Sequence, residues 1–233
     1  MTLEFVQPGA AIAPLKAVLY GPIGSGKSVG ACTAPGPILY LNSEGPDALT
    51  ESRRMFGDAK IHEVVFAGKQ TLTDVRLYLR NNPTAEKTIV IDSVGECYQL
   101  LLAEMGDRPT LQNFGDANIL IERFVRDLRN DPTHHLVLVA HEEIKDAAGE
   151  TIRRPSTGGQ KLPEMLMGMV STVAYCGVVT DEETGAVTYM AQFAQANGRR
   201  AKNRGGALGK TRPLDLSEWI QTMRGAAAKE KAK

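Results

Sequence analysis

Short apolar runs recur along this chain between polar or amphipathic segments, and each run has the length of a buried strand. The run LKAVLY (15–20) is bounded by Pro14 and Gly21, and KTIVIDS (87–93) is rich in β-branched residues. Continuous apolar runs of this kind are typical of strands that are covered on both faces of a sheet. The other predicted strands are PILYLNSE (37–44), IHEVVFA (61–67), HLVLVAH (135–141), STVAYCGVV (171–179) and AVTYMAQF (186–193), the last two joined as a hairpin by the glycine turn DEETG.

Helices are predicted between most of these strands. In TLTDVRLYLRN (71–81), the residues Leu72, Val75 and Leu79 fall on one helical face. Strands that alternate with helices indicate an α/β domain with a mostly parallel central sheet, helices on both faces and a C-terminal β-hairpin. The other predicted helices are 47–56, 94–105, 116–130 and 214–224, and the predicted organisation is an N-terminal arm (1–14), one domain (15–224) and a flexible basic tail (225–233).

The segment GPIGSGKS (21–28) matches the pattern G-x-x-x-x-G-K-[ST] directly after a predicted strand and at the start of a helix. In this setting the glycines let backbone N–H groups point at phosphate oxygens, and the helix adds its positive end. Lys27 would bridge the β- and γ-phosphates, and Ser28 would offer its hydroxyl to Mg²⁺. A glycine turn that contains Lys-Ser by chance is the alternative, which spacing and context disfavour. We therefore expect ATP and Mg²⁺, with the nucleotide bound by Gly21, Pro22, Ile23, Gly24, Ser25, Gly26, Lys27, Ser28 and Val29.

The polar residues that close the apolar runs are candidates for the rest of the site, because ligands bind at the carboxyl ends of the strands in such sheets. Asp92 would hold Mg²⁺ through a water, and it could also be the N-cap of the next helix. Because Ser93 and not a glutamate follows it, Glu44 is the first candidate for polarising the attacking water, with Glu96 as the weaker alternative. Glu44 could instead only favour the start of the next helix. His141 is a candidate γ-phosphate sensor, although a histidine that closes a strand is often only an edge residue.

The net charge is zero but unevenly distributed, since residues 199–233 hold ten basic and three acidic residues. This asymmetry is compatible with an anionic ligand or with protomers that stack a basic face on an acidic one. Within that segment, Lys202 and Arg204 follow an alternating run at a spacing of two, so on an extended chain both point to the same side. They form either a solvated basic edge that discourages strand pairing or a pair of cations aimed at an anion.

The cysteines and the hydropathy of the chain indicate in which cellular compartment the protein is expected. The three cysteines, Cys32, Cys97 and Cys176, are widely spaced and form no CxxC, so we expect buried free thiols in a reducing compartment. No apolar run approaches the ~20 residues that cross a bilayer. The N-terminus lacks the basic region of a signal peptide. We expect a cytoplasmic protein with no membrane partner.

Together these residues resemble the RecA-like ATPase core. The shared features are the Walker A segment, Glu44 at the end of the next strand, IVIDS without a following glutamate, and the polar His141 after VLVA. The stretch AKNRGG (201–206) resembles the Lys-x-Arg finger of the RadA, DnaB and KaiC relatives. The order of elements and the run HEEIKDAAGETIRRPSTGGQKLPEML (141–166) resemble the phage nucleotide-binding proteins of the Sak-type single-strand annealing group. The resemblance covers roughly residues 15–220 and implies a RecA-like P-loop NTPase fold.

The resemblance also implies a function. ATP would lie between protomers of a homo-oligomer, a ring or a filament, in which Lys202 and Arg204 of one subunit reach the γ-phosphate of the next. Single-stranded DNA would bind on two loops, 106–116 and 142–161, and would stimulate an ATPase that promotes annealing or recombination, in the host cytoplasm if the protein is phage-encoded. A single-strand-binding protein is a further candidate partner. The alternatives for the function are a DnaB-type motor or loader, a KaiC-like regulatory ATPase that acts on protein partners, and a small-molecule kinase. For the second loop, the alternative is that AAGE (147–150) is an ordinary hairpin turn whose charged neighbours are only solvated. The candidate DNA contacts are Arg108, Lys145, Arg153, Arg154 and Lys161.

Overall fold

The computed structural model describes residues 13–147 and 149–231. The predicted N-terminal arm therefore lies outside the described residues except for residues 13 and 14. In the part of the chain that the structure describes, no helix combines the length and hydropathy needed to span a bilayer.

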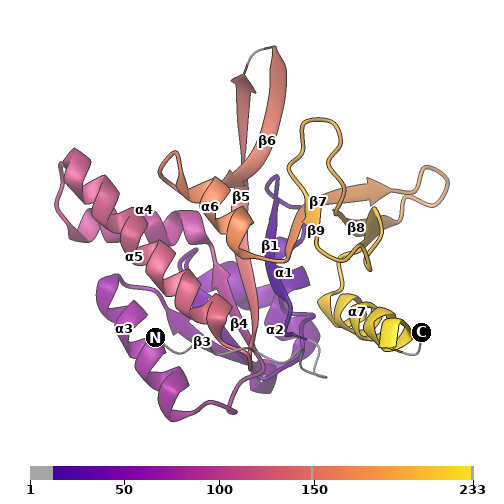
Figure 1. Ribbon diagram of the computed structural model, residues 1–233, viewed down its shortest axis with the longest axis horizontal. Coiled ribbons are helices and arrows are strands. Elements are labelled where there is room, and N and C mark those ends of the chain that lie inside the picture. Colours follow the sequence, from indigo (N-terminus) through magenta and orange to yellow (C-terminus); the bar gives the residue numbers. More distant parts are fainter. Residues whose placement is uncertain (1–12, 148, 232–233) are drawn as a thin grey trace, which may run out of the picture.

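A single ten-stranded sheet forms the centre of the molecule (Figure 1). Its order is β10-β8-β7-β1-β5-β4-β2-β3, with β6 added to β5 and β9 added to β7. The strands from β7 to β3 in this order are parallel, while β6, β8, β9 and β10 pair antiparallel. The strands are β1 (Lys16–Gly21), β2 (Ile38–Asn42), β3 (Ile61–Val65), β4 (Thr88–Asp92), β5 (His135–Ala147), β6 (Glu150–Ser156), β7 (Thr172–Thr180), β8 (Val187–Gln192), β9 (Lys202–Asn203) and β10 (Thr211–Pro213).

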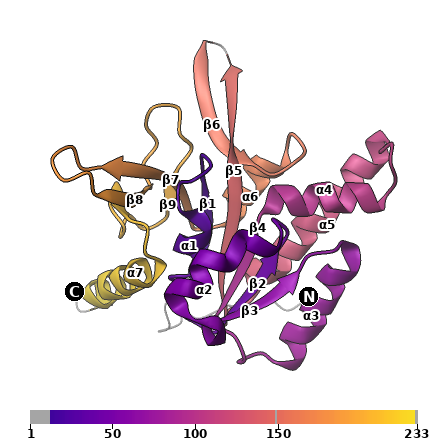
Figure 2. The same ribbon diagram turned by 180° about the vertical axis from the view of Figure 1, so that it is seen from behind.

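Helices cover both faces of this sheet (Figures 1 and 2). The alternation of side chains along β1 shows why both faces need cover, since Val18 and Tyr20 belong to one hydrophobic core and Ala17 and Leu19 to the other. The first core includes residues of α3, α4, α5 and α6, and the second includes residues of α1 and α7. The helices are α1 (Lys27–Ala31), η1 (Pro46–Leu49), α2 (Thr50–Phe56), η2 (Asp58–Lys60), α3 (Lys69–Asn81), α4 (Val94–Glu104), α5 (Leu111–Asn130), α6 (Leu162–Met169) and α7 (Leu216–Lys231).

The predicted fold class is confirmed: this is an α/β domain with a mostly parallel central sheet, helices on both faces and a C-terminal hairpin formed by β7 and β8. Helix α7 closes the second core through Trp219, which is fully buried and meets Phe193 edge to face at 4.8 Å between ring centroids. Residues 225–231 of the predicted tail lie in the last turns of this helix.

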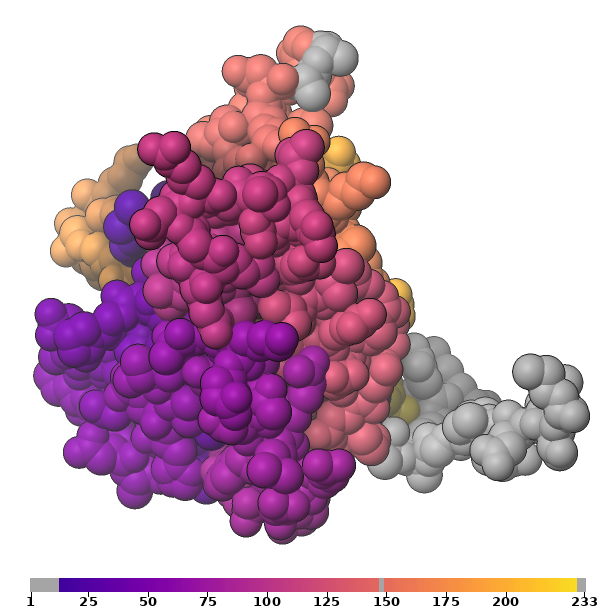
Figure 3. Space-filling model, turned by 90° about the vertical axis from the view of Figure 1, so that its left-hand side faces the viewer, coloured from indigo at the N-terminus to yellow at the C-terminus, as the bar shows by residue number. Residues whose placement is uncertain are grey.

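The prediction of a loop over residues 142–161 is wrong for most of its length, and the alternative, a hairpin turn at AAGE (147–150), is confirmed. Strand β5 continues beyond His141 and pairs with β6 in seven consecutive antiparallel pairs, from His141 with Ser156 to Ala147 with Glu150. The ladder satisfies the backbone hydrogen bonds of this segment, so a two-stranded arm replaces a loop. The arm projects from the sheet in Figure 1 and stands clear of the surface of α4 and α5 in Figure 3.

The other predicted loop, 106–116, is also partly regular. Helix α5 begins at Leu111, five residues earlier than predicted, because Thr110 and Asn113 form a capping box. Phe114 therefore lies in the first turn of a helix, where it is 41% exposed.

Candidate nucleotide site

The predicted phosphate loop connects β1, which ends at Gly21, to α1, which begins at Lys27. Gly24 and Gly26 have φ values of 77° and 76°, which side chains rarely tolerate. The Lys27 ammonium group lies inside the loop and donates to Gly21 O at 3.1 Å, Pro22 O at 2.8 Å and Ser25 Oγ at 3.2 Å. All three acceptors are neutral, and burial lowers the pKa of Lys27. A buried cation at a helix N-terminus with neutral partners is a site for an anion.

The predicted metal ligands Ser28 and Asp92 lie next to each other. Asp92 ends β4, is 2% exposed and accepts a hydrogen bond from the hydroxyl of Tyr40, and both Ser28 and Asp92 line the same cavity. Burial raises the pKa of this carboxyl group. One hydroxyl and one carboxylate oxygen suit Mg²⁺, which keeps several of its waters in sites of this kind. The alternative role for Asp92 as a helix cap is wrong, because Ser93 is the N-cap of α4 and accepts from Glu96 N at 3.3 Å.

Glu44 and His141 contact each other at the carboxyl edge of the sheet. His141 Nε2 lies 3.3 Å from Glu44 Oε1, and the Ser93 hydroxyl donates to the same oxygen. The His141 interaction lowers the pKa of Glu44, and Glu44 in turn raises the pKa of His141. Both contacts engage Oε1, so Oε2 of Glu44 is the oxygen left to polarise a water. The weaker alternative, Glu96, is one turn into α4 and only its backbone N–H reaches Ser93.

One cavity of about 520 Å³ brings these groups together. Its volume is in the range of small-molecule sites. Asp47 and Ala48 were not identified as site residues from the sequence. Their position three and four residues after Glu44 is a signal that could have indicated them. Tyr189, a residue of β8 that no motif indicates, was also not identified. The cavity is lined by Ile23, Gly24, Ser25, Gly26, Lys27, Ser28, Val29, Glu44, Asp47, Ala48, Asp92, His141 and Tyr189.

Lys202 and Arg204 lie away from the phosphate loop of their own chain. Lys202 pairs with Val173, which pairs with Val18, three residues before the end of β1. Arg204 continues in the same direction, since its N–H donates to Ser171 O just before β7 begins. The Lys202 ammonium group donates to Met167 O at 2.5 Å, and Arg204 is exposed. Both cations therefore lie toward the amino ends of the parallel strands, opposite the edge that holds Asp92 and Glu44.

Three of the predicted DNA contacts are paired with carboxylates on the β5–β6 arm. Arg153 donates to Glu142 at 2.8 Å, and Arg154 donates to Glu143 at 2.8 Å. Lys145 also lies 3.1 Å from Glu143. The arm therefore carries acids beside these three cations, and their role as DNA contacts stays a prediction. The remaining two candidates, Arg108 and Lys161, are exposed.

A second hollow of about 440 Å³ adjoins the nucleotide cavity, and His141 lines both. It lies between α4, the first turn of α5 and the segment after β6. The ring of Tyr98 packs so closely on Gly158 that a Cβ at this position would lie 2.3 Å from it. The other residues that line this hollow are Gly95, Glu96, Gln99, Phe114, Ser156 and Gly159.

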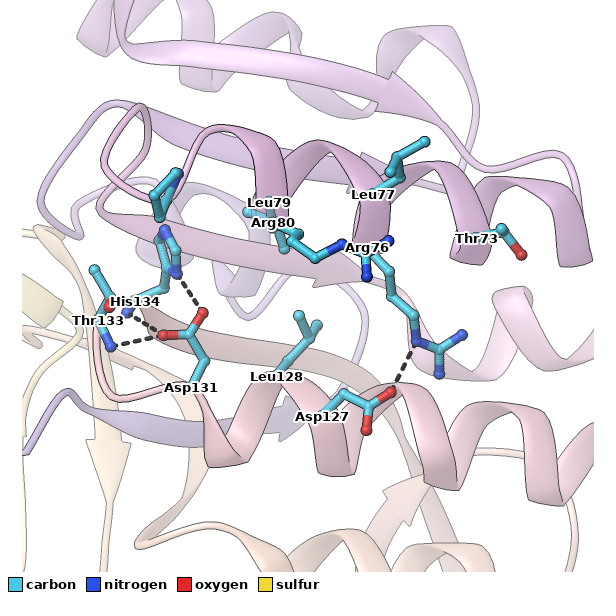
Figure 4. Close-up of a pocket in the computed structure, with 11 residues that line it drawn as sticks. Thr73, Arg76, Leu77, Leu79, Arg80, Asp127, Leu128, Asp131, Thr133 and His134 are labelled. Carbon is cyan, nitrogen blue, oxygen red and sulfur yellow. Dashed lines mark hydrogen bonds and ion pairs between the residues drawn. The ribbon is translucent and has the colours of Figure 1, made fainter.

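A larger hollow of about 670 Å³ opens between α3 and α5 (Figure 4). Arg76 Nε donates to Asp127 at 2.8 Å across it, and His134 Nδ1 lies 2.6 Å from Asp131. Because Asp131 and His134 precede β5, this hollow lies at the amino ends of the strands. It is separate from the nucleotide site.

Fold and site together define a P-loop nucleotide-binding domain. A family model described as "AAA domain" matches residues 13–205, and the chain belongs to this family. It is therefore a P-loop ATPase domain, a class that binds nucleotide, usually with Mg²⁺. No curated protein matches the chain. Among solved structures it is similar to a KaiC-like protein from the hyperthermophilic archaeon Pyrococcus horikoshii, with 15% identity, a TM-score of 0.47, and coverage of 86% of this chain and 85% of that one. Membership of the Sak-type group stays a prediction.

Proposed function

We propose that this chain hydrolyses ATP at a site that is completed by Lys202 and Arg204 of a neighbouring protomer. The observation that carries the proposal is the charge of the nucleotide cavity. Lys27 is the only lysine or arginine that lines it in the described part of the chain. A triphosphate brings several negative charges, and more charge develops on its oxygens in the transition state. The site of one protomer is therefore short of positive charge.

The chain's own residues divide the remaining work. Lys27 and the N–H groups at the start of α1 bind the phosphates. Ser28 and Asp92 would hold Mg²⁺, which supplies further positive charge. Glu44 orients the attacking water through Oε2, while His141 and Ser93 hold its other oxygen. The ion pair with His141 keeps Glu44 ionised, so it can accept a hydrogen bond from water at neutral pH.

Lys202 and Arg204 suit a role in trans for a geometric reason. Both lie toward the edge of the sheet opposite their own phosphate loop, so neither is placed to serve it. Strand β9 ends at Asn203 and Arg204 begins the turn that follows, so the spacing of two does not by itself align the two side chains, but Arg204 is exposed and open to a neighbouring protomer. An arginine supplied by a neighbour can raise turnover by ~10³–10⁵. The expected assembly is a homo-oligomer.

We further propose single-stranded DNA as the partner that controls turnover, with annealing or recombination as the outcome. The support is the hollow that shares His141 with the nucleotide cavity. The exposed Phe114 lines this hollow and offers a face for base stacking. Lys161 follows two residues after Gly159, which also lines the hollow, and would bind a phosphate of the strand. A strand bound there would move His141, and thereby change how tightly Glu44 is held.

A first experiment measures ATP turnover against protein concentration, with and without single-stranded DNA, at low and moderate salt. Turnover per protomer that rises steeply with concentration, together with a large species on a sizing column, is expected. DNA should raise turnover further, and less so at higher salt. Turnover that is independent of concentration would overturn the site in trans. Turnover indifferent to DNA at each salt concentration would favour a regulatory ATPase that acts on protein partners.

A variant pair tests the finger directly. Arg204→Ala should bind ATP normally and lose most of its turnover. Lys210→Ala is the matched control, because Lys210 is an exposed cation of the same basic segment. Among the described residues only its carbonyl oxygen is engaged, by Phe193 N. Equal turnover in the two variants would contradict the proposed role of Arg204.

A further inference from the structure

The aromatic ring of Tyr189 packs directly on the phosphate loop. A Cβ atom at Gly26 would lie 2.6, 2.8 and 3.1 Å from three carbons of this ring. Tyr189 nevertheless remains 44% exposed and lines the nucleotide cavity. One part of the side chain is thus fixed against the loop, and another part faces the space that the nucleotide would occupy.

Tyr189 lies at the end of the site opposite the metal and the water. In the sheet, the strands that carry Asp92 and His141 lie on one side of β1, and β7 and β8 lie on the other side (Figure 1). The terminal phosphate must lie near Asp92 and Glu44 for hydrolysis to occur. The remainder of a nucleotide that is bound across Lys27 and Ser28 then extends toward β8.

The backbone of Tyr189 is well supported. It pairs with Val178 in the β7–β8 ladder, and its carbonyl oxygen accepts from Leu214 N at 2.9 Å. The ring is therefore carried by a strand and not by a loop. Its hydroxyl group donates to no residue within 13–147 or 149–231, so the side chain does not act as a hydrogen-bonded anchor there.

We infer that Tyr189 is the platform on which the base of the bound nucleotide stacks. The inference rests on the proposed ATP site and adds the residue that holds the base. A flat aromatic face beside the phosphate loop suits a purine, which offers a larger stacking surface than a pyrimidine. Stacking of this kind tolerates different bases because each has a π-face. Gly26 has a second purpose in this arrangement, since any side chain there would displace the ring.

The test compares ATP with inorganic tripolyphosphate, which has the phosphates but no base. Dissociation constants for both ligands, with Mg²⁺, are measured by calorimetry for the wild type and four variants. Tyr189→Ala and Tyr189→Leu remove the ring, and the leucine retains apolar contact with Gly26. Tyr189→Phe retains the ring. Val187→Ala is the control, because Val187 lies two residues earlier on the same face of β8 and is 56% exposed.

Loss of the ring should weaken ATP binding about five- to hundredfold and leave tripolyphosphate binding unchanged. The Phe and control variants should bind both ligands like the wild type. Equal weakening of both ligands in the Ala and Leu variants would overturn the inference, because Tyr189 would then only support the loop. Unchanged ATP binding in these variants would also overturn it. A wild-type protein that binds neither ligand would instead refute the proposed ATP site itself.

Discussion

Replacement of Gly26 by alanine tests how the phosphate loop is built. Gly26 has a φ of 76°, and a residue with a Cβ atom pays about 1–2 kcal/mol in this left-handed conformation. The new methyl group would also lie 2.6 Å from the ring of Tyr189, well inside contact distance. Overpacking of this kind typically costs about 1–3 kcal/mol. Gly26→Ala should therefore lower the free energy of unfolding by about 2–5 kcal/mol.

The two contributions can be separated by a double-mutant cycle. In a Tyr189→Ala background the ring is absent, so only the backbone term of about 1–2 kcal/mol should remain. Urea unfolding of the wild type, the two single variants and the double variant at pH 7.5 measures the coupling between the two positions. A coupling of about 1–3 kcal/mol is expected.

Additive effects of the two substitutions would refute this reasoning. They would mean that the ring does not press on the loop in solution. The same four proteins give a functional reading, because under the proposed function the backbone N–H of Gly26 would bind phosphate. Gly26→Ala should weaken the binding of tripolyphosphate as well as ATP, whereas Tyr189→Ala should weaken only ATP.

Three further predictions concern titrating groups. Burial, aided by nearby cations, lowers the pKa of His135 to about 4, and its Nδ1 accepts from Leu15 N at 2.8 Å. The neutral ring therefore stabilises the folded state fully above pH 6.5, and this stabilisation is lost as the pH falls toward 4. When the pH is lowered from 7.5 to 5.5, the free energy of urea unfolding should fall by about 1 kcal/mol more in the wild type than in His135→Asn. Equal decreases in the two proteins would contradict this. Glu44→Gln should bind ATP but turn it over about 10²–10⁴ times more slowly, and unchanged turnover would exclude Glu44 as the group that activates water. Because His141 lowers the pKa of Glu44, His141→Gln should move the acid limb of the pH–turnover profile to higher pH. An acid limb at the same pH in this variant would mean that His141 does not control the ionisation of Glu44.

The convergence of the nucleotide site could be predicted because it depends on strand ends. Lys27, Asp92, Glu44 and His141 each follow an apolar run, and parallel strands in one sheet bring their carboxyl ends to one edge. The sequence pattern therefore determines which residues meet, although it does not determine which of them bond to each other. The direct contact of His141 with Glu44 is a result of side-chain geometry.

Features that depend on register or on distant packing could not be predicted. The hairpin turn at AAGE could be read from the sequence, but the length of its two strands could not, because EEIK has no clear apolar alternation. The pairing of Arg154 with Glu143 follows only from the β5–β6 register. Tyr189 is 163 residues after Gly26, and their contact requires the antiparallel β8 to pack beside the loop. Asp92 was a plausible cap from its place before a predicted helix, and only the structure shows that Ser93 caps α4.

The most direct test of the central claim mixes two inactive proteins. Lys27→Ala lacks its own phosphate site but still carries the finger, and Arg204→Ala has an intact phosphate site but lacks the finger. If a neighbour completes each site, a mixture of the two should hydrolyse ATP although neither hydrolyses it alone, with turnover highest near equal amounts. A mixture as inactive as its components would contradict a site that is completed in trans.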